Sequence, residues 1–187
     1  MLTLREIALG VLGAWRLANF DPSGMACFDR SLHGVWRSFR VAILVAPAEA
    51  LLSYLDYAAA PSAGALRAAL VGAIAYVVGW TAFPLAAAYV APAIGRDAEY
   101  PGYLVAYNWA TILQVALILP VDGAIALGLL PHGVADVLFL ASRLVILAYA
   151  WFIARTGLRL GGAAAAGMVA LDIVISLIIA RAVIAMS

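Results

Sequence analysis

The chain has 187 residues, of which 67% are hydrophobic and only 11% are charged. A soluble globular domain is closer to half apolar and a quarter charged, so this composition indicates a membrane protein. The net charge of +1 gives no reason to expect a nucleic-acid partner, and the single cysteine, Cys27, excludes an internal disulfide and a cysteine-based metal cluster. Several apolar runs exceed the roughly 18 residues that cross a bilayer core. The sequence therefore predicts an all-α, polytopic transmembrane bundle of about five spans, with an amphipathic interfacial helix at its N-terminus.

The first twenty or so residues predict that amphipathic helix, because apolar and polar side chains separate on a helical wheel. The apolar face holds Leu4, Ile7, Val11, Trp15 and Ala18. The opposite face holds Arg5, Glu6, Arg16 and Asn19. Because the charges do not suit a spanning helix, we expect residues 2–19 to lie parallel to the membrane, with Arg5, Trp15 and Arg16 at the interface. A cleaved signal peptide is the alternative, which the position of Arg16 disfavours.

The segment after this helix is polar and carries the strongest cluster of positive charge in the chain. Arg30, Arg37 and Arg40 come just before the first apolar run. Under the positive-inside rule this cluster places the N-terminus in the cytoplasm, and we expect a multi-pass protein of a bacterial inner membrane. Ser31 or Ser38 is in position to cap the helix that follows.

Two parts of the chain follow from these patterns, a cytoplasmic or interfacial segment of residues 1–35 and a transmembrane bundle of residues 36–187. The expected spans cover residues 38–56, 65–93, 103–120, 134–154 and 160–185. Residues 121–130 lie between two prolines and are too short to span alone, so they either extend the third span or form a short outer interfacial piece. The arginines of the loops favour a C-terminus on the outer side, although Arg181 disagrees.

Each span carries a polar side chain near its middle, and these form a predicted midplane cluster. Its members are Glu49, Thr81, Gln114, Arg143 and Asp172. A rise of 1.5 Å per residue places them at a similar depth, about 16–22 Å from the cytoplasmic ends. An isolated charge there costs at least about 2.5–3.5 kcal/mol, so such groups normally face the bundle interior and pair. The cluster either fixes helix packing or forms an ion, proton or solute site, with Glu49 or Asp172 carrying the proton.

The last two spans predict a specific ion pair within this cluster. Arg143 and Asp172 lie fourteen to fifteen residues on either side of the turn between Gly157 and Leu158. Antiparallel helices joined by a short turn bring such positions level, so we expect Arg143 to pair with Asp172. Glu49 on the first span is the competing partner for Arg143.

None of the sequence motifs of catalysis is recognisable. We find no phosphate-binding glycine loop, no nucleophile elbow and no histidine on a span that suits haem ligation, so we expect no catalytic residue, cofactor or metal. The predicted function is a non-enzymatic integral membrane protein that binds or organises partners in the bilayer, either other membrane proteins or copies of itself. The alternative is a small channel or transporter with a midplane acidic site. A hydrated cavity that reaches Glu49 or Asp172 would favour the transporter.

The start of the third span carries a family resemblance. Tyr100-Pro101-Gly102-Tyr103, followed by Trp109, is similar to the aromatic start of that helix in Yip1-like membrane proteins. A short polar N-terminal segment before five closely spaced spans also resembles that family, over about residues 36–186. The resemblance implies an integral membrane protein, with contacts to small GTPases in the eukaryotic members. The acidic-aromatic motif of those members is not visible here, and no functional residue is carried over.

Overall fold

The computed structural model describes residues 3–59 and 64–186, which form seven α-helices and one 3-10 helix with no strand among them. In chain order these are α1 (Leu4–Ala18), η1 (Pro22–Cys27), α2 (Leu32–Ser38), α3 (Val41–Ala59), α4 (Ala65–Ala93), α5 (Tyr100–Ala126), α6 (His132–Gly157) and α7 (Gly162–Met186). Among the described residues, five helical stretches are long and apolar enough to cross a membrane: Leu32–Ala58, Ala65–Ala93, Tyr100–Ala126, His132–Gly157 and Gly162–Met186. The all-α fold with five candidate spans is therefore confirmed.

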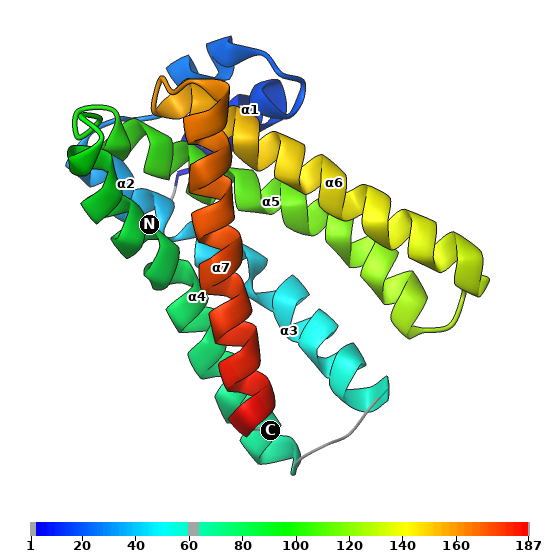
Figure 1. The fold of residues 1–187 in the computed structure, drawn as a ribbon. Helices are drawn as coiled ribbons and strands as arrows, with labels where there is room; N and C mark the ends of the chain where they lie inside the picture. The colour runs from blue at the N-terminus through cyan, green and yellow to red at the C-terminus, as the bar shows by residue number, and fades with distance from the viewer. Residues whose placement is uncertain (1–2, 60–63, 187) are drawn as a thin grey trace.

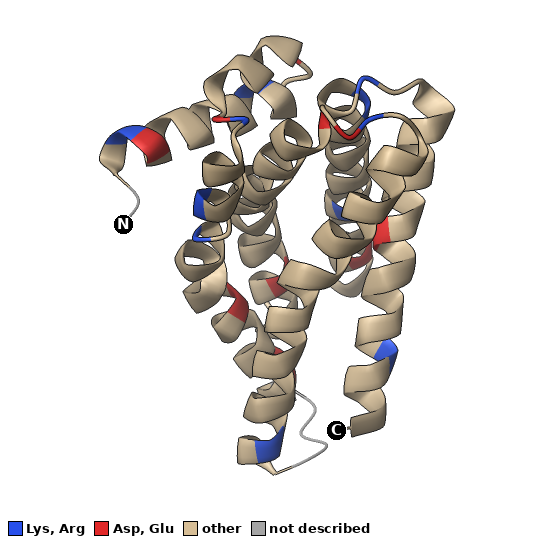
Figure 2. Ribbon diagram, turned by 90° about the vertical axis from the view of Figure 1, so that its left-hand side faces the viewer, with Lys and Arg blue, Asp and Glu red and all other residues tan. Residues whose placement is uncertain are grey.

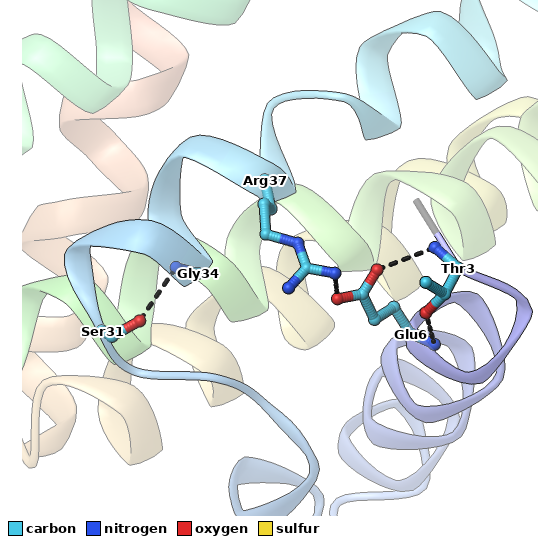
Figure 3. A network of polar contacts seen from close by, with 5 residues as sticks. All are labelled: Thr3, Glu6, Ser31, Gly34 and Arg37. Carbon is cyan, nitrogen blue, oxygen red and sulfur yellow. Dashed lines mark hydrogen bonds and ion pairs between the residues drawn. The ribbon is translucent and has the colours of Figure 1, made fainter. Parts of the chain in front are cut away.

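Hydroxyl side chains begin the two N-terminal helices. Thr3 and Glu6 form a capping box, in which the Glu6 N–H donates to the Thr3 hydroxyl and the Thr3 N–H donates to the Glu6 carboxylate, at 2.8 Å (Figure 3). Ser31 caps α2 and accepts from the Gly34 N–H at 3.0 Å, which confirms one of the two predicted caps. Glu6 also forms an ion pair with Arg37, so the start of α1 is tied to α2. These contacts satisfy N–H groups that a helix start leaves free.

The third span is longer than the sequence indicated. Pro120 lies inside α5, and the helix continues for six residues to Ala126 before Gly128 turns the chain with a φ of +66°. Residues 121–126 therefore extend the third span, which answers the question that the sequence left open. Proline is tolerated within spanning helices because neighbouring groups satisfy the backbone that it frees. The extension matters because it carries Asp122 into the bundle.

The tightly packed core lies at one end of the bundle, where α1 and η1 cover the ends of the long helices. Its largest fully buried side chains are Phe83, Leu17, Ile153, Leu158, Val41, Asn108 and Ser38. Toward the other end the helices spread apart, with α4 beside α7 and α5 beside α6 (Figure 1). Large apolar side chains such as Leu70, Ile74, Leu140 and Ile178 are exposed there. A lipid environment accommodates such surfaces without the penalty that water would impose.

Helix α1 is part of this core, a contact within the protein that the sequence did not predict. The residues it buries are small, apart from one leucine: Gly10, Gly13, Ala14 and Leu17. Of the predicted apolar face, Ile7 and Val11 pack against the core, but Leu4 and Trp15 stay 87% and 60% exposed. The phenol of Tyr149 on α6 donates to the Ala14 carbonyl at 2.8 Å, which fixes α1 across the bundle. Exposed apolar side chains such as Leu4 and Trp15 suit a membrane interface, and the interfacial role of this helix stays a prediction.

Candidate functional site

A cavity of about 750 Å³ lies between α3 and α4, toward the end of the bundle remote from α1. Its residues come from both helices and from one position on α7: Ala46, Glu49, Ala50, Ser53, Tyr54, Tyr57, Ala65, Ala68, Ala69, Gly72, Ala73, Ala75, Tyr76 and Val183. The volume falls within the range of about 300–1,000 Å³ that is usual for small-molecule sites. Glu49 is the only charged side chain among the described residues of this lining.

The sequence builds this cavity from two helical faces. On α4 the small residues at positions 65, 68, 69, 72 and 73 follow the three-and-four spacing that places side chains on one face. On α3 the same spacing brings positions 46, 49, 50, 53 and 57 to one face. Because the α4 face carries only alanine and glycine over this stretch, it fills little of the space opposite α3. The paired periodicity was readable in the sequence, but alanine is so frequent that the pattern did not stand out.

Glu49 lies in the wall of this cavity, and the described part of the chain places no cationic side chain beside its carboxyl. Its carboxyl is half-buried and makes no hydrogen bond or ion pair to any residue that the structure describes. It interacts electrostatically with Asp122 on α5, which is a second carboxyl, and with the phenol of Tyr76 on α4. The Tyr76 hydroxyl donates instead to the Ala42 carbonyl at 2.6 Å, so it is held in place on the α3 side.

The predicted pair between Arg143 and Asp172 is wrong. Arg143 donates through Nη2 to Oδ2 of Asp122 at 2.6 Å, and its guanidinium lies over the Phe139 ring at 4.5 Å from the centroid. The physical reason is the extension of α5 past Pro120, which places Asp122 beside α6. Within a membrane, an arginine pairs with the carboxylate that a neighbouring helix holds at contact distance, and equal counting from a turn does not establish that distance.

Asp172 has a different partner. Both of its carboxylate oxygens accept from the Tyr107 hydroxyl on α5, at 3.1 and 3.2 Å. The ring of Tyr107 packs against Phe83 of α4 with centroids 4.8 Å apart, so the phenol is held in the core. Asp172 therefore joins α7 to α5 at the packed end of the bundle, while Arg143 joins α6 to α5 elsewhere.

Thr81 and Gln114 belong to neither pair. The Thr81 hydroxyl donates to carbonyls of its own helix at Val77 and Val78, and the side chain is exposed. Gln114 is half-buried on α5 and makes no hydrogen bond within the described part of the chain. The predicted midplane cluster is thus divided into a group of Glu49, Asp122 and Arg143 and a separate contact of Asp172. The sequence analysis did not include Asp122 in the cluster, because the sequence left open whether the residues after Pro120 belong to the third span.

A second polar contact was also missed. Asn108, which is fully buried on α5, donates to the Ser38 hydroxyl at the end of α2 at 2.8 Å. Ser38 in turn donates to the Val35 carbonyl at 2.7 Å, so it serves as a link between helices rather than as a cap. This hydrogen bond fixes the position of α5 in the core. Neither Asn108 nor Ser38 is among the residues that line the cavity between α3 and α4.

The interface residues of α1 lie on its outer side. Arg5 and Arg16 are exposed with Trp15, and Arg16 donates to the Ser23 hydroxyl at 3.5 Å. Figure 2 shows that much of the basic ribbon lies toward the end of the molecule that holds α1. There Arg159, after α6, lies 3.8 Å from Glu99, before α5.

The charges near the cavity leave a negative excess. Glu49 and Asp122 are two carboxyls, and Arg143 is bonded to Asp122. Ionisation of both acids would leave one unit of negative charge inside the bundle, which is costly unless a proton or another cation neutralises it. Among the described residues, no group of three or more His, Cys, Asp and Glu side chains is placed to hold a metal ion. The arrangement therefore suits a monovalent cation or a proton.

No protein-family model, curated protein or solved structure matches this chain. The fold supports a multi-pass membrane protein through its five apolar helices. The resemblance to Yip1-like proteins stays a prediction.

Proposed function

We propose that this protein is a small membrane transporter or binding protein that takes a lipophilic organic cation into the cavity between α3 and α4. The observation that carries the proposal is that Glu49, whose carboxyl has no hydrogen-bond or ion-pair partner among the described residues, lines a cavity of about 750 Å³. Tyr54, Tyr57 and Tyr76 supply aromatic surface around it. Aromatic rings and a carboxylate together attract cations, and alanine walls accept their apolar substituents.

A proton competes with the cation in this proposal. Because Glu49 is the only carboxylate among the described residues of the cavity lining, this lining is neutral either when Glu49 is protonated or when the cation is bound. Exchange of one for the other would allow the cation to be driven by a proton gradient. The proposal assigns no catalytic role to any residue and needs no cofactor.

We expect tetraphenylphosphonium, a lipophilic cation, to bind the purified protein in detergent, and Glu49→Gln to weaken binding at least about tenfold, which corresponds to about 1.4 kcal/mol. The matched control is Asp56→Asn, which removes an exposed carboxylate from the same helix outside the cavity lining. Equilibrium dialysis with radiolabelled cation measures the affinity of both variants. As a control for charge, a neutral tetraphenyl compound should bind no tighter to wild type than to Glu49→Gln. Equal affinity of the two variants for the cation would contradict the proposal.

The second candidate is a non-enzymatic protein that organises partners in the membrane. The observation that favours it is the spread of the helices away from the packed end, which leaves large apolar faces exposed. Other membrane proteins or further copies of this chain are the partners that such faces suit. Wild-type protein that binds no cation in the same assay would favour this candidate.

We also propose a bacterial inner-membrane location, an N-terminus in the cytoplasm and membership of the Yip1-like group. The span count and spacing support the last of these. The meeting of α1, η1 and the basic turns at one end supports the orientation, because arginines concentrate on the cytoplasmic side of membrane proteins.

The single cysteine provides a test of orientation. We expect Cys27, which is partly exposed in η1, to react only with thiol reagents that enter the cell. The control is a Cys27→Ala chain with Leu129→Cys, because Leu129 is 69% exposed in the turn after α5, at the opposite end of the spans. That position should react with impermeant maleimide on intact cells. The reverse pattern of labelling would show that the N-terminus lies outside.

A further inference from the structure

A second cavity, of about 400 Å³, lies at the packed end of the bundle, between η1, the start of α5 and the turn after α6. It is lined by Pro22, Met25, Arg30, Ala98, Glu99, Gly102, Thr156, Gly157 and Arg159. Two of these side chains are cationic and one is anionic, so the lining carries a net positive charge. The helices α5 and α6 begin and end here, which places the cavity at the depth of lipid headgroups if they span a membrane.

The backbone of α5 makes room for one of the arginines. Arg30 lies across Gly102, where an added Cβ would come within 3.2 Å of the Arg30 Cγ and 3.3 Å of its Cδ. The guanidinium is held from the other side by the Met25 carbonyl, which accepts from Nη2 at 3.1 Å. Arg30 is therefore positioned before any ligand arrives, which reduces the entropy lost on binding.

Arg159 is held less tightly and in an uncommon conformation. The φ angle of Arg159 is +52°, which lies in the left-handed region. Glycine usually occupies this region after a helix end, but this chain has an arginine at the position. Its only ion pair in the described chain is a long contact of 3.8 Å with Glu99, and its side chain is 70% exposed. The guanidinium is therefore free to turn toward an anion in the cavity. Thr156 beside it has a hydroxyl that donates to no described residue.

We propose that this cavity binds a phosphate group, carried either by an anionic lipid or by a soluble molecule, between Arg30 and Arg159 with Thr156 as a further donor. Guanidinium groups match the geometry of phosphate oxygens and bind them through short, charge-assisted hydrogen bonds. Basic pockets at the ends of spanning helices are suited to lipid headgroups. The volume accommodates a glycerophosphate group and leaves acyl chains to follow the exposed apolar helices. The proposal does not depend on the cavity at Glu49.

The test uses the purified full chain in nanodiscs of phosphatidylcholine, titrated with dihexanoyl phosphatidic acid and, separately, with inorganic phosphate. Arg159→Gln should weaken binding of the short-chain lipid about tenfold, because a charged hydrogen-bond donor is lost. Arg159 is suited to substitution because it is exposed and has little part in the core. Arg155→Gln is the matched control: it removes the same charge from the same helix end, where Arg155 lies over Trp151 and outside the cavity lining.

Glu99→Gln gives a test of opposite sign. Removal of the Glu99 charge releases Arg159 and makes the cavity more positive, so the affinity for dihexanoyl phosphatidic acid should rise. The control is Asp97→Asn, which lies on the same loop but is exposed and outside the lining. This variant should leave the affinity unchanged. Binding of the lipid alone would identify a headgroup site, and similar binding of inorganic phosphate would identify a soluble ligand. Equal loss in Arg159→Gln and Arg155→Gln would overturn the proposal, as would no binding of either probe or no gain in Glu99→Gln.

Discussion

We expect Arg143→Leu to lower the free energy of unfolding by about 3 kcal/mol, because it leaves Asp122 within the bundle without its counter-charge. The breaking of a buried ion pair by removal of one partner typically costs about 3–5 kcal/mol. The lower end applies here, since the Arg143 and Asp122 side chains keep 32% and 23% of their accessible surface. The Asp122 atom Oδ1 has no partner among the described residues, so the carboxylate depends strongly on the single bond through Oδ2.

Double-mutant cycles identify the partner of Arg143. Arg143→Leu combined with Asp122→Leu should cost less than the sum of the two single changes, by more than about 1 kcal/mol, because the pair is removed together. Arg143→Leu combined with Asp172→Leu should be additive within about 0.5 kcal/mol, since Asp172 bonds to Tyr107. Unfolding in mixed detergent micelles, followed by circular dichroism, measures each variant. Coupling to Asp172 without coupling to Asp122 would restore the pairing that the sequence predicted.

A helical hairpin determines the level of residues along its two helices, but it does not determine which residues face each other. The turn after α6 fixes the levels of Arg143 and Asp172 along their helices, and the sequence predicted both helices correctly. It does not fix how each helix is rotated about its axis. Rotation depends on which faces pack, and α7 lies against α4 as well as α6. Asp172 turns to Tyr107, so equal depth in the membrane was not sufficient to predict contact.

Span positions were predictable because they depend on hydropathy and length alone. The five long apolar helices begin and end within about six residues of the expected spans, since long apolar runs have few other structures open to them in a membrane. The cap at Ser31 was predictable for a similarly local reason, the need of a helix start for an acceptor. The cavity at Glu49 was harder to predict, because it forms where α4 has no large side chains to fill the space opposite α3. Two matching faces of small residues become informative only when the helices are known to be neighbours.

The N-terminal helix shows the same limit most clearly. Its amphipathic pattern predicted a helix that turns its large apolar residues to a membrane. The structure shows that its glycines make close contacts within the protein, Gly10 with Trp109 of α5 and Gly13 with Phe28 and Cys27. Close approach of two helices requires small residues at the contact, and hydropathy scales give glycine little weight. Gly10 lies directly under the indole of Trp109, and a Cβ added to it would overlap ring atoms of that indole. Tyr149 then reaches the backbone one turn further along, at Ala14.

Gly10→Leu should therefore force α1 away from α5. We expect a loss of about 2–3 kcal/mol in the free energy of unfolding, the upper part of the range for overpacking, because both the indole and the helix backbone are held by other contacts. Gly79→Leu is the matched control, since a Cβ on Gly79 of α4 meets nothing within 4 Å. Thermal unfolding in detergent measures the loss. Limited proteolysis should then cut Gly10→Leu, but not Gly79→Leu, near Arg16, because the displaced helix exposes its backbone. If instead both variants were equally stable and resistant to protease, α1 would rest on the membrane rather than on Trp109, as the wheel of Leu4, Val11 and Trp15 alone predicts.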